Sequence, residues 1–157
     1  MSEHFRRMVA LADEFFKTKN DPEQLDVNEE VIEQLLSIHP FTLSQHEVGD
    51  GPVCWILLIP SSLQTMNDFL SGKISEKNVL EQALQTKKPE AIYLCSALVL
   101  PEFRNQGIAK RLTLEAIKAM RDSFPITILY AWPFSEEGSK LSELISKETQ
   151  LPLRLKN

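Results

Sequence analysis

The chain of 157 residues is long enough for one domain with a buried core, and its 43% hydrophobic and 25% charged residues are ordinary for a globular protein. Its formal net charge of −5 differs from the basic balance of dedicated nucleic-acid-binding proteins, so we expect no nucleic-acid partner. No apolar run approaches the length of a membrane span, and residues 1–18 carry charges throughout, unlike a signal peptide, so we expect a cytoplasmic protein without a membrane partner.

Two amphipathic helices are predicted at the start of the chain, joined by the polar residues 18–26. The first follows Ser2, a residue type that caps helices, and has one apolar face made of Phe5, Met8, Val9, Ala12, Phe15 and Phe16. The second is capped by Asp26 or Asn28 and ends before Pro40. Its apolar stripe consists of Val31, Ile32, Leu35, Leu36 and Ile38.

A β-hairpin and two short helices are predicted next. Residues 41–48 and 53–59 have the apolar patterns of strands, and a turn cluster of Gly49, Asp50, Gly51 and Pro52 separates them. Residues 63–70 and about 75–84 are predicted as helices, with Ser75 as the cap of the second.

The middle of the chain predicts a strand followed by a helix. Residues 91–100 form an almost unbroken apolar run, which is typical of a strand covered on both faces, and Pro101 ends it. A helix is predicted from about Gln106, because apolar residues recur at helical spacing at Ile108, Leu112, Ala116 and Met120. Residues 126–132 then predict a second buried strand, residues 135–149 a last helix, and residues 151–155 a short final strand.

The junction between residues 91–100 and the following helix has the composition of an anion site. The first turn of a helix presents unpaired N–H groups and the positive end of its dipole. Gly107 has no Cβ and Ala109 has only a methyl group, so a ligand can approach the backbone closely. Arg104, Lys110 and Arg111 add positive charge around the same turn. This combination predicts a pyrophosphate site, although neither a dinucleotide-binding nor a P-loop glycine pattern is present.

At this junction the sequence resembles the GNAT (Gcn5-related) N-acyltransferases. Their acyl-CoA motif is a strand ending in L-x-V-x-P, then R/Q-x-x-G-x-G/A, then a helix, and here the matching residues are Val99, Pro101, Arg104, Gly107 and Ala109. The resemblance covers most of the chain and implies an α/β (α+β) fold with a mixed, mostly antiparallel central sheet flanked by helices. It implies one acyl-CoA-binding domain over residues 1–157.

Three departures from the family pattern are visible. No strand signal precedes the first helix, about thirty residues (61–90) form a helical insertion before the motif strand, and the last two family strands are reduced to residues 151–157 at most. We therefore expect a sheet with fewer strands, and an insertion that shapes the substrate side.

The resemblance also implies the cofactor and its contacts. Acetyl-CoA would pair its pantetheine arm with the strand backbone at Ala97, Leu98 and Val99. Its pyrophosphate would lie on the loop and first helical turn formed by Arg104, Asn105, Gln106, Gly107, Ile108, Ala109 and Lys110. The acetyl group would pass to the amine of a small molecule or peptide.

The catalytic residues are harder to assign. By spacing from Arg104, Tyr93 occupies the position of the glutamate that family members often carry, and Ser142 occupies the position of their tyrosine on the last helix. Tyr93 is a candidate proton carrier, although a core tyrosine is the alternative, and Glu90 is a candidate that would act through a water. His46 is a possible base, and Trp132 and Phe134 are possible lining residues of an acceptor pocket.

Three interpretations remain open: an acetyltransferase, a GNAT-like domain that binds CoA or acyl-CoA without turnover, and a small α/β protein whose Gly107 turn binds nothing. We expect a monomer or a homodimer. We expect no metal site, because His4, His39 and His46 lack ligand spacing, and reduced thiols, because Cys54 and Cys95 lie in apolar runs.

Overall fold

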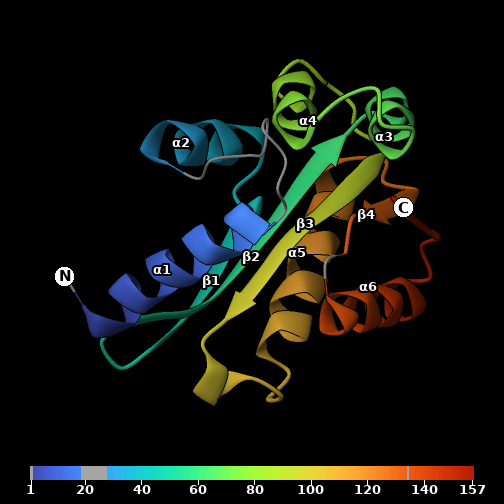
Figure 1. Cartoon of the computed structure of the whole chain (residues 1–157). Helices are drawn as coiled ribbons and strands as arrows, with labels where there is room; N and C mark the ends of the chain where they lie inside the picture. Colours follow the sequence, from blue (N-terminus) through green and yellow to red (C-terminus); the bar gives the residue numbers. More distant parts are fainter. Residues whose placement is uncertain (1, 19–27, 134) are drawn as a thin grey trace.

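The computed structural model describes residues 2–18, 28–133 and 135–157. A central five-stranded sheet is flanked by helices (Figure 1). The elements in chain order are α1 (Glu3–Thr18), α2 (Glu29–Ile38), β1 (Leu43–Val48), β2 (Gly51–Ser61), α3 (Leu63–Leu70), α4 (Glu76–Ala83), β3 (Ala91–Val99), the 3₁₀ helix η1 (Pro101–Phe103), α5 (Ile108–Ser123), β4 (Ile128–Ala131), α6 (Glu136–Thr149) and β5 (Leu153–Leu155).

The strands lie in the order β1-β2-β3-β4-β5, as they follow along the chain. The β1–β2 and β2–β3 pairs are antiparallel and have the longer ladders, whereas the β3–β4 and β4–β5 pairs are parallel and short. The predicted mixed, mostly antiparallel sheet is therefore confirmed. Within the described residues no strand precedes α1, and β5 is the strand that follows α6, so the sheet is small, as expected.

Side-chain caps fix the starts of several helices. Asn28 accepts a hydrogen bond from the backbone N–H of Val31 at 3.0 Å and so caps α2, whereas the alternative cap, Asp26, lies outside the described residues. Ser75 and Asn78 form a capping box at the start of α4. Ser135 caps α6 by accepting the N–H of Gly138 at 3.0 Å. These caps satisfy N–H groups that a helix start otherwise leaves unpaired.

Apolar clusters cover both faces of the sheet, and Figure 1 shows α1 and α5 on opposite sides of it. Successive residues of β2 alternate between the faces, so Leu57 and Ile59 pack toward α3 and α4, and Ile56 and Leu58 pack toward α5. This arrangement explains why β2 and the first half of β3 read as continuous apolar runs.

The face of α1 was predicted only in part. Met8 is fully buried and packs against Val53, as expected for the apolar face. Phe5 and Val9, which belonged to the predicted face, are 37% and 46% exposed, and Leu11 packs on the cluster instead. The buried stripe is thus centred about one residue away from the prediction.

The two C-terminal strands are shorter than predicted. β4 covers Ile128–Ala131 rather than residues 126–132, and the N–H of Thr127 bonds to the carbonyl of Glu90 just before the β3–β4 ladder begins. β5 covers Leu153–Leu155 and pairs in parallel with β4. In the described part of the chain, no helix is long and apolar enough to cross a membrane, and no three His, Cys, Asp or Glu side chains gather as a metal site.

Candidate functional site

The site begins where β3 parts from β4. Pairing between these parallel strands runs from Ala91 opposite Ile128 to Leu94 opposite Ala131. β3 then continues to Val99 paired with β2 only, among the described residues. Cys95 lies at the point of separation and is an extra residue in the β2–β3 ladder, where Leu58 pairs with Leu94 and the preceding Leu57 pairs with Ser96. Such a β-bulge bends the strand locally, and the pairing of β3 with β4 ends beside it. The second half of β3 therefore presents an open edge.

The loop and helix that follow β3 place an uncapped helix start beside this edge. Gly107 is the residue before α5 and has φ 78°, the left-handed region that glycine adopts without strain. No side chain caps α5, so the N–H groups of its first turn face outward at the positive end of the helix dipole. A Cβ added at Gly107 would meet no atom within 4 Å. The backbone here is open to a ligand.

A cavity of about 510 Å³ joins the strand edge to this turn. Its wall comes from α1, β2, β3, the loop before α5, the first turns of α5, the end of β4 and α6. Nine of the ten residues predicted to bind the cofactor line it: Ala97, Leu98, Val99, Arg104, Asn105, Gly107, Ile108, Ala109 and Lys110. Gln106 lies outside the lining, and its Nε2 donates to the carbonyl of Glu102 at 3.3 Å.

The predicted cations around the turn are partly engaged with the protein itself. Arg104 donates through Nε to the carbonyl of Val99 at 3.0 Å, which ties the loop back to the end of β3. Lys110 pairs with Glu148 of α6 at 2.7 Å, and Arg111 contacts Glu115 at 3.5 Å. Arg111 also lies 3.3 Å from His46 on β1, the residue considered as a possible base.

Tyr93 lies in the core, outside the cavity lining. Its ring is fully buried, and its hydroxyl donates to Oε2 of Glu76 on α4 at 2.5 Å. Burial, and after it the neighbouring side chains of Cys95 and Glu76, hold the pKa of Tyr93 well above its usual value. The hydroxyl is therefore a hydrogen-bond donor inside the protein, and the role of Tyr93 in proton transfer stays a prediction.

Glu90 lies at the other end of β3 from the cavity. Its side chain is half-buried, and its carbonyl accepts the N–H of Thr127 at 2.8 Å where β3 and β4 come together. The structure thus separates Glu90 from the nine predicted cofactor residues that line the cavity. Its catalytic role also stays a prediction.

The cavity contains polar groups that the sequence did not single out as site residues. Thr113 lines it from the second turn of α5, and Ser96 lines it from β3. Cys95 also lines the cavity, and its Sγ donates to Glu76 at 3.7 Å. Thr113 follows Ala109 by four residues, so helical spacing from the predicted turn could have pointed to it.

The C-terminal part of the lining includes two positions that the sequence had marked. Ser142, at the family's tyrosine position, lines the cavity and donates to the carbonyl of Gly138 at 2.9 Å. Trp132 lines it as well, whereas Phe134 lies outside the described residues. Cys54 of β2 is not among the lining residues, and burial raises the pKa of its thiol to about 12.

The fold and the site define a mixed α/β protein with an uncapped helix start beside a strand that parts from its parallel neighbour. The model of the acetyltransferase (GNAT) family matches residues 23–137, which is more than half of the sequence. The chain therefore belongs to the GNAT acetyltransferase family.

Two solved structures are similar to it. The loading GNATL domain of CurA from Lyngbya majuscula is 19% identical with a TM-score of 0.55, and the match covers 74% of this chain and 55% of that one. A ribosomal-protein-alanine N-acetyltransferase from Brucella melitensis biovar Abortus 2308 is 22% identical with a TM-score of 0.40, covering 64% of this chain and 57% of that one. The chain thus spans little more than half of either structure. The first likeness shows the fold. No curated protein matches.

Proposed function

We propose that the chain is an acetyltransferase that moves an acetyl group from acetyl-CoA to an amine while both substrates are bound. The observation that carries this proposal is the open edge of β3 beside the uncapped start of α5, joined to it by one cavity. Membership of the GNAT family supports N-acyltransferase chemistry in general. The cofactor, its contacts, the single domain over residues 1–157 and the acceptor are part of the proposal.

The geometry around Gly107 fits the cofactor. A pyrophosphate needs several N–H donors and room to approach the backbone, and the first turn of α5 and the empty space at Gly107 offer both. An extended arm needs a strand edge that is free on one side, and residues 97–99 of β3 have no strand partner on the β4 side in the described structure. Residues 104–110 would hold the phosphates.

Bound acetyl-CoA supplies an activated thioester for transfer to a deprotonated amine. The backbone of Ala97, Leu98 and Val99 would hold the arm by strand-like hydrogen bonds and direct an amide N–H toward the carbonyl oxygen. Leu11, Phe15 and Trp132 form an apolar part of the wall that would exclude water. Residues for proton transfer are not assigned beyond the predictions for Tyr93 and Glu90.

The acceptor would be the amine of a small molecule or peptide. The net charge of −5 mildly favours a cationic acceptor approaching from solution. The apolar contributions of α1 and Trp132 to the cavity wall favour an acceptor with an apolar part next to the reacting nitrogen.

A second candidate is a domain that binds CoA or acyl-CoA without turnover. The side chains that this protein has at two positions, where family members often carry the catalytic base and acid, favour this candidate. Tyr93 is turned away from the cavity toward Glu76, and Ser142 donates to the carbonyl of Gly138. A serine hydroxyl is a much weaker acid than a tyrosine hydroxyl, so Ser142 would not replace the latter as a proton donor.

One substitution tests the placement of the site. Gly107→Glu adds a side chain and a negative charge to the proposed phosphate cradle, and it should abolish both CoA binding and amine-dependent thiol release from acetyl-CoA. Gly49→Glu is the matched control, because Gly49 has φ 63° and equally open surroundings but lies in the β1–β2 turn. Both variants carry the same kind of backbone strain.

The outcomes separate the candidate functions. Loss of CoA binding in Gly107→Glu but not in Gly49→Glu supports the proposed cofactor site, and thiol release with any amine of a panel then supports turnover. Binding without thiol release favours the second candidate. Normal CoA binding by a folded Gly107→Glu variant would show that the site is misplaced.

A further inference from the structure

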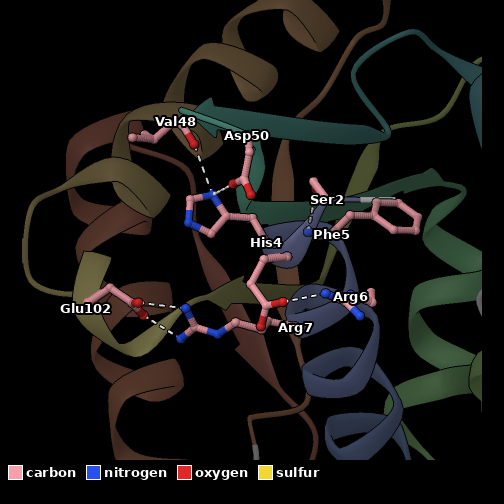
Figure 2. A network of polar contacts seen from close by, with 9 residues as sticks. Ser2, His4, Phe5, Arg6, Arg7, Val48, Asp50 and Glu102 are labelled. Atoms are coloured by element: carbon pink, nitrogen blue, oxygen red, sulfur yellow. Dashed lines mark hydrogen bonds and ion pairs between the residues drawn. The ribbon is translucent and has the colours of Figure 1, made fainter.

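The first turns of α1 contact the segment that leads into the proposed phosphate loop (Figure 2). Arg7 forms a bidentate pair with Glu102 of η1, in which its two terminal nitrogens lie 2.6 and 2.7 Å from the two carboxylate oxygens. One turn earlier, His4 contacts the β1–β2 turn, with Nδ1 2.9 Å from the carbonyl of Val48 and 2.9 Å from Asp50. The His4 ring also lies edge-on to Phe103, with centroids 5.7 Å apart.

The residue that Arg7 holds is itself bonded to the loop. The carbonyl of Glu102 accepts the side-chain N–H of Gln106, and the N–H of Arg104 donates to the carbonyl of Pro101, both at 3.3 Å. Phe103 and Arg104, the two residues after Glu102, line the cavity. Asn105 has φ 63° without being glycine, so the loop adopts an unfavourable backbone conformation that its surroundings must maintain. The contacts of Glu102 with Arg7 and Gln106 help to hold the loop in this conformation.

The charge of Glu102 matters as much as its position. Glu102 is ionised at neutral pH, as an exposed carboxyl is, and the hydrogen bonds from Arg7 lower its pKa further, to about 2. An ionised carboxylate two residues before Arg104 would repel a phosphate group in the loop. The guanidinium of Arg7 balances that charge. Most surface ion pairs contribute little to stability. A planar bidentate pair between two elements is an exception, because its two parallel hydrogen bonds fix the geometry.

We infer that Arg7 is a positioning residue for the nucleotide end of the cofactor: it holds the Glu102–Gln106 segment in its binding conformation and neutralises Glu102. This inference rests on the proposed function, because it needs the phosphates of CoA on residues 104–110. Arg7 acts through Glu102 rather than on the reacting atoms. Its loss should therefore weaken binding of the nucleotide part and leave the chemical step unchanged.

The test measures the dissociation constant of CoA by titration calorimetry on the full chain and three variants. Arg7→Ala should weaken CoA binding about tenfold. Glu102→Gln should weaken it by a smaller factor, about threefold, because the charge next to the phosphates is removed together with the restraint. Arg6→Ala is the matched control, since Arg6 pairs with Glu3 within α1 at 2.6 Å and does not reach η1. It should bind CoA like the parent chain.

A comparison of donors separates positioning from general damage to the fold. Arg7→Ala should raise KM for acetyl-CoA and leave kcat and the KM for acetyl-pantetheine, which lacks the nucleotide, unchanged. Equal losses with both donors, or unchanged CoA binding in Arg7→Ala, would overturn the inference. Tighter CoA binding by Glu102→Gln would also overturn the inference. That result would mean that Glu102 only masks the positive charge of Arg7 and that the pair does not position the loop. Absence of CoA binding by the parent chain would overturn the proposed function and this inference with it.

Discussion

Glu76 brings a carboxylate into the core of the protein. The residue is fully buried on α4, and its Oε2 accepts hydrogen bonds from the hydroxyl of Tyr93 at 2.5 Å and from Sγ of Cys95 at 3.7 Å. Burial of a carboxylate is costly unless donors replace its hydration. The Tyr93 hydroxyl is one such donor. Tyr93, which sequence spacing marked as a catalytic candidate, therefore stabilises the buried carboxyl of Glu76.

Tyr93→Phe removes that donor with little change in shape. We expect the free energy of unfolding to fall by about 1.5–3 kcal/mol, since the buried carboxyl of Glu76 loses a hydrogen-bond donor that lies 2.5 Å away. Urea denaturation at neutral pH measures it. Tyr130→Phe is the matched comparison, because the Tyr130 ring stacks on that of Tyr93 at 5.0 Å but its hydroxyl bonds to the neutral Ser61 at 2.6 Å. It should lose only about 0.5–1.5 kcal/mol.

Two results would change this interpretation of Tyr93. Equal losses of stability in the two variants would show that the Tyr93–Glu76 hydrogen bond is no stronger than the Tyr130–Ser61 hydrogen bond. A large fall in kcat for Tyr93→Phe, with CoA binding retained, would support Tyr93 as the proton carrier that the sequence spacing predicted.

At the level of elements, α3 and α4 are part of the core rather than an appendage. Phe69 of α3 is 1% exposed, and its ring packs against those of Tyr93 at 4.9 Å, Trp132 at 5.9 Å and Tyr130 at 6.1 Å. The ammonium of Lys156 also lies over the Phe69 ring, 5.2 Å from its centroid. The insertion thus joins the middle of β3, the end of β4 and the C-terminal residues.

Phe69→Ala should therefore destabilise the whole molecule. Loss of a buried aromatic ring from such a cluster costs about 3–5 kcal/mol, because the cavity left behind fills only in part. Leu63→Ala on the same helix is the control, since Leu63 is 38% exposed, and it should change stability by less than about 0.5 kcal/mol. Thermal unfolding that is equally affected by both substitutions would mean that α3 does not contribute to the common core.

Local sequence patterns placed most elements correctly, because caps, prolines and apolar spacing act over a few residues. Ser75 and Asn78 predicted the start of α4, and the apolar run from Ala91 predicted β3. The buried face of α1 was predicted about one residue away from its true position. Phe5 and Leu11 are equally apolar, and only the position of the sheet decides which of them is covered. The short η1 helix that begins at Pro101 was also missed, since three residues show no periodic pattern.

At the scale of the whole molecule, the site depends on strand pairing that no local sequence pattern predicts. The separation of β3 from β4 after Leu94 and the bulge at Cys95 are set by the shapes of the packed elements. The turn before α5 could be predicted from Gly107, because its φ of 78° favours glycine, whereas cofactor binding there stays a prediction. Glu76 could not be linked to Tyr93 from the sequence, because the contact joins residues of two different elements that meet only after folding.

The central claim is that this cavity binds acetyl-CoA, and the most direct measurement is the thermal unfolding midpoint of the full chain with and without it. A ligand present at about one hundred times its dissociation constant adds about 2.7 kcal/mol of stability, which corresponds to a rise of about 5–10 °C for a chain of this size. We predict a rise of this order with millimolar acetyl-CoA. An unchanged midpoint at that concentration would contradict the account and leave a GNAT fold whose Gly107 turn does not hold CoA.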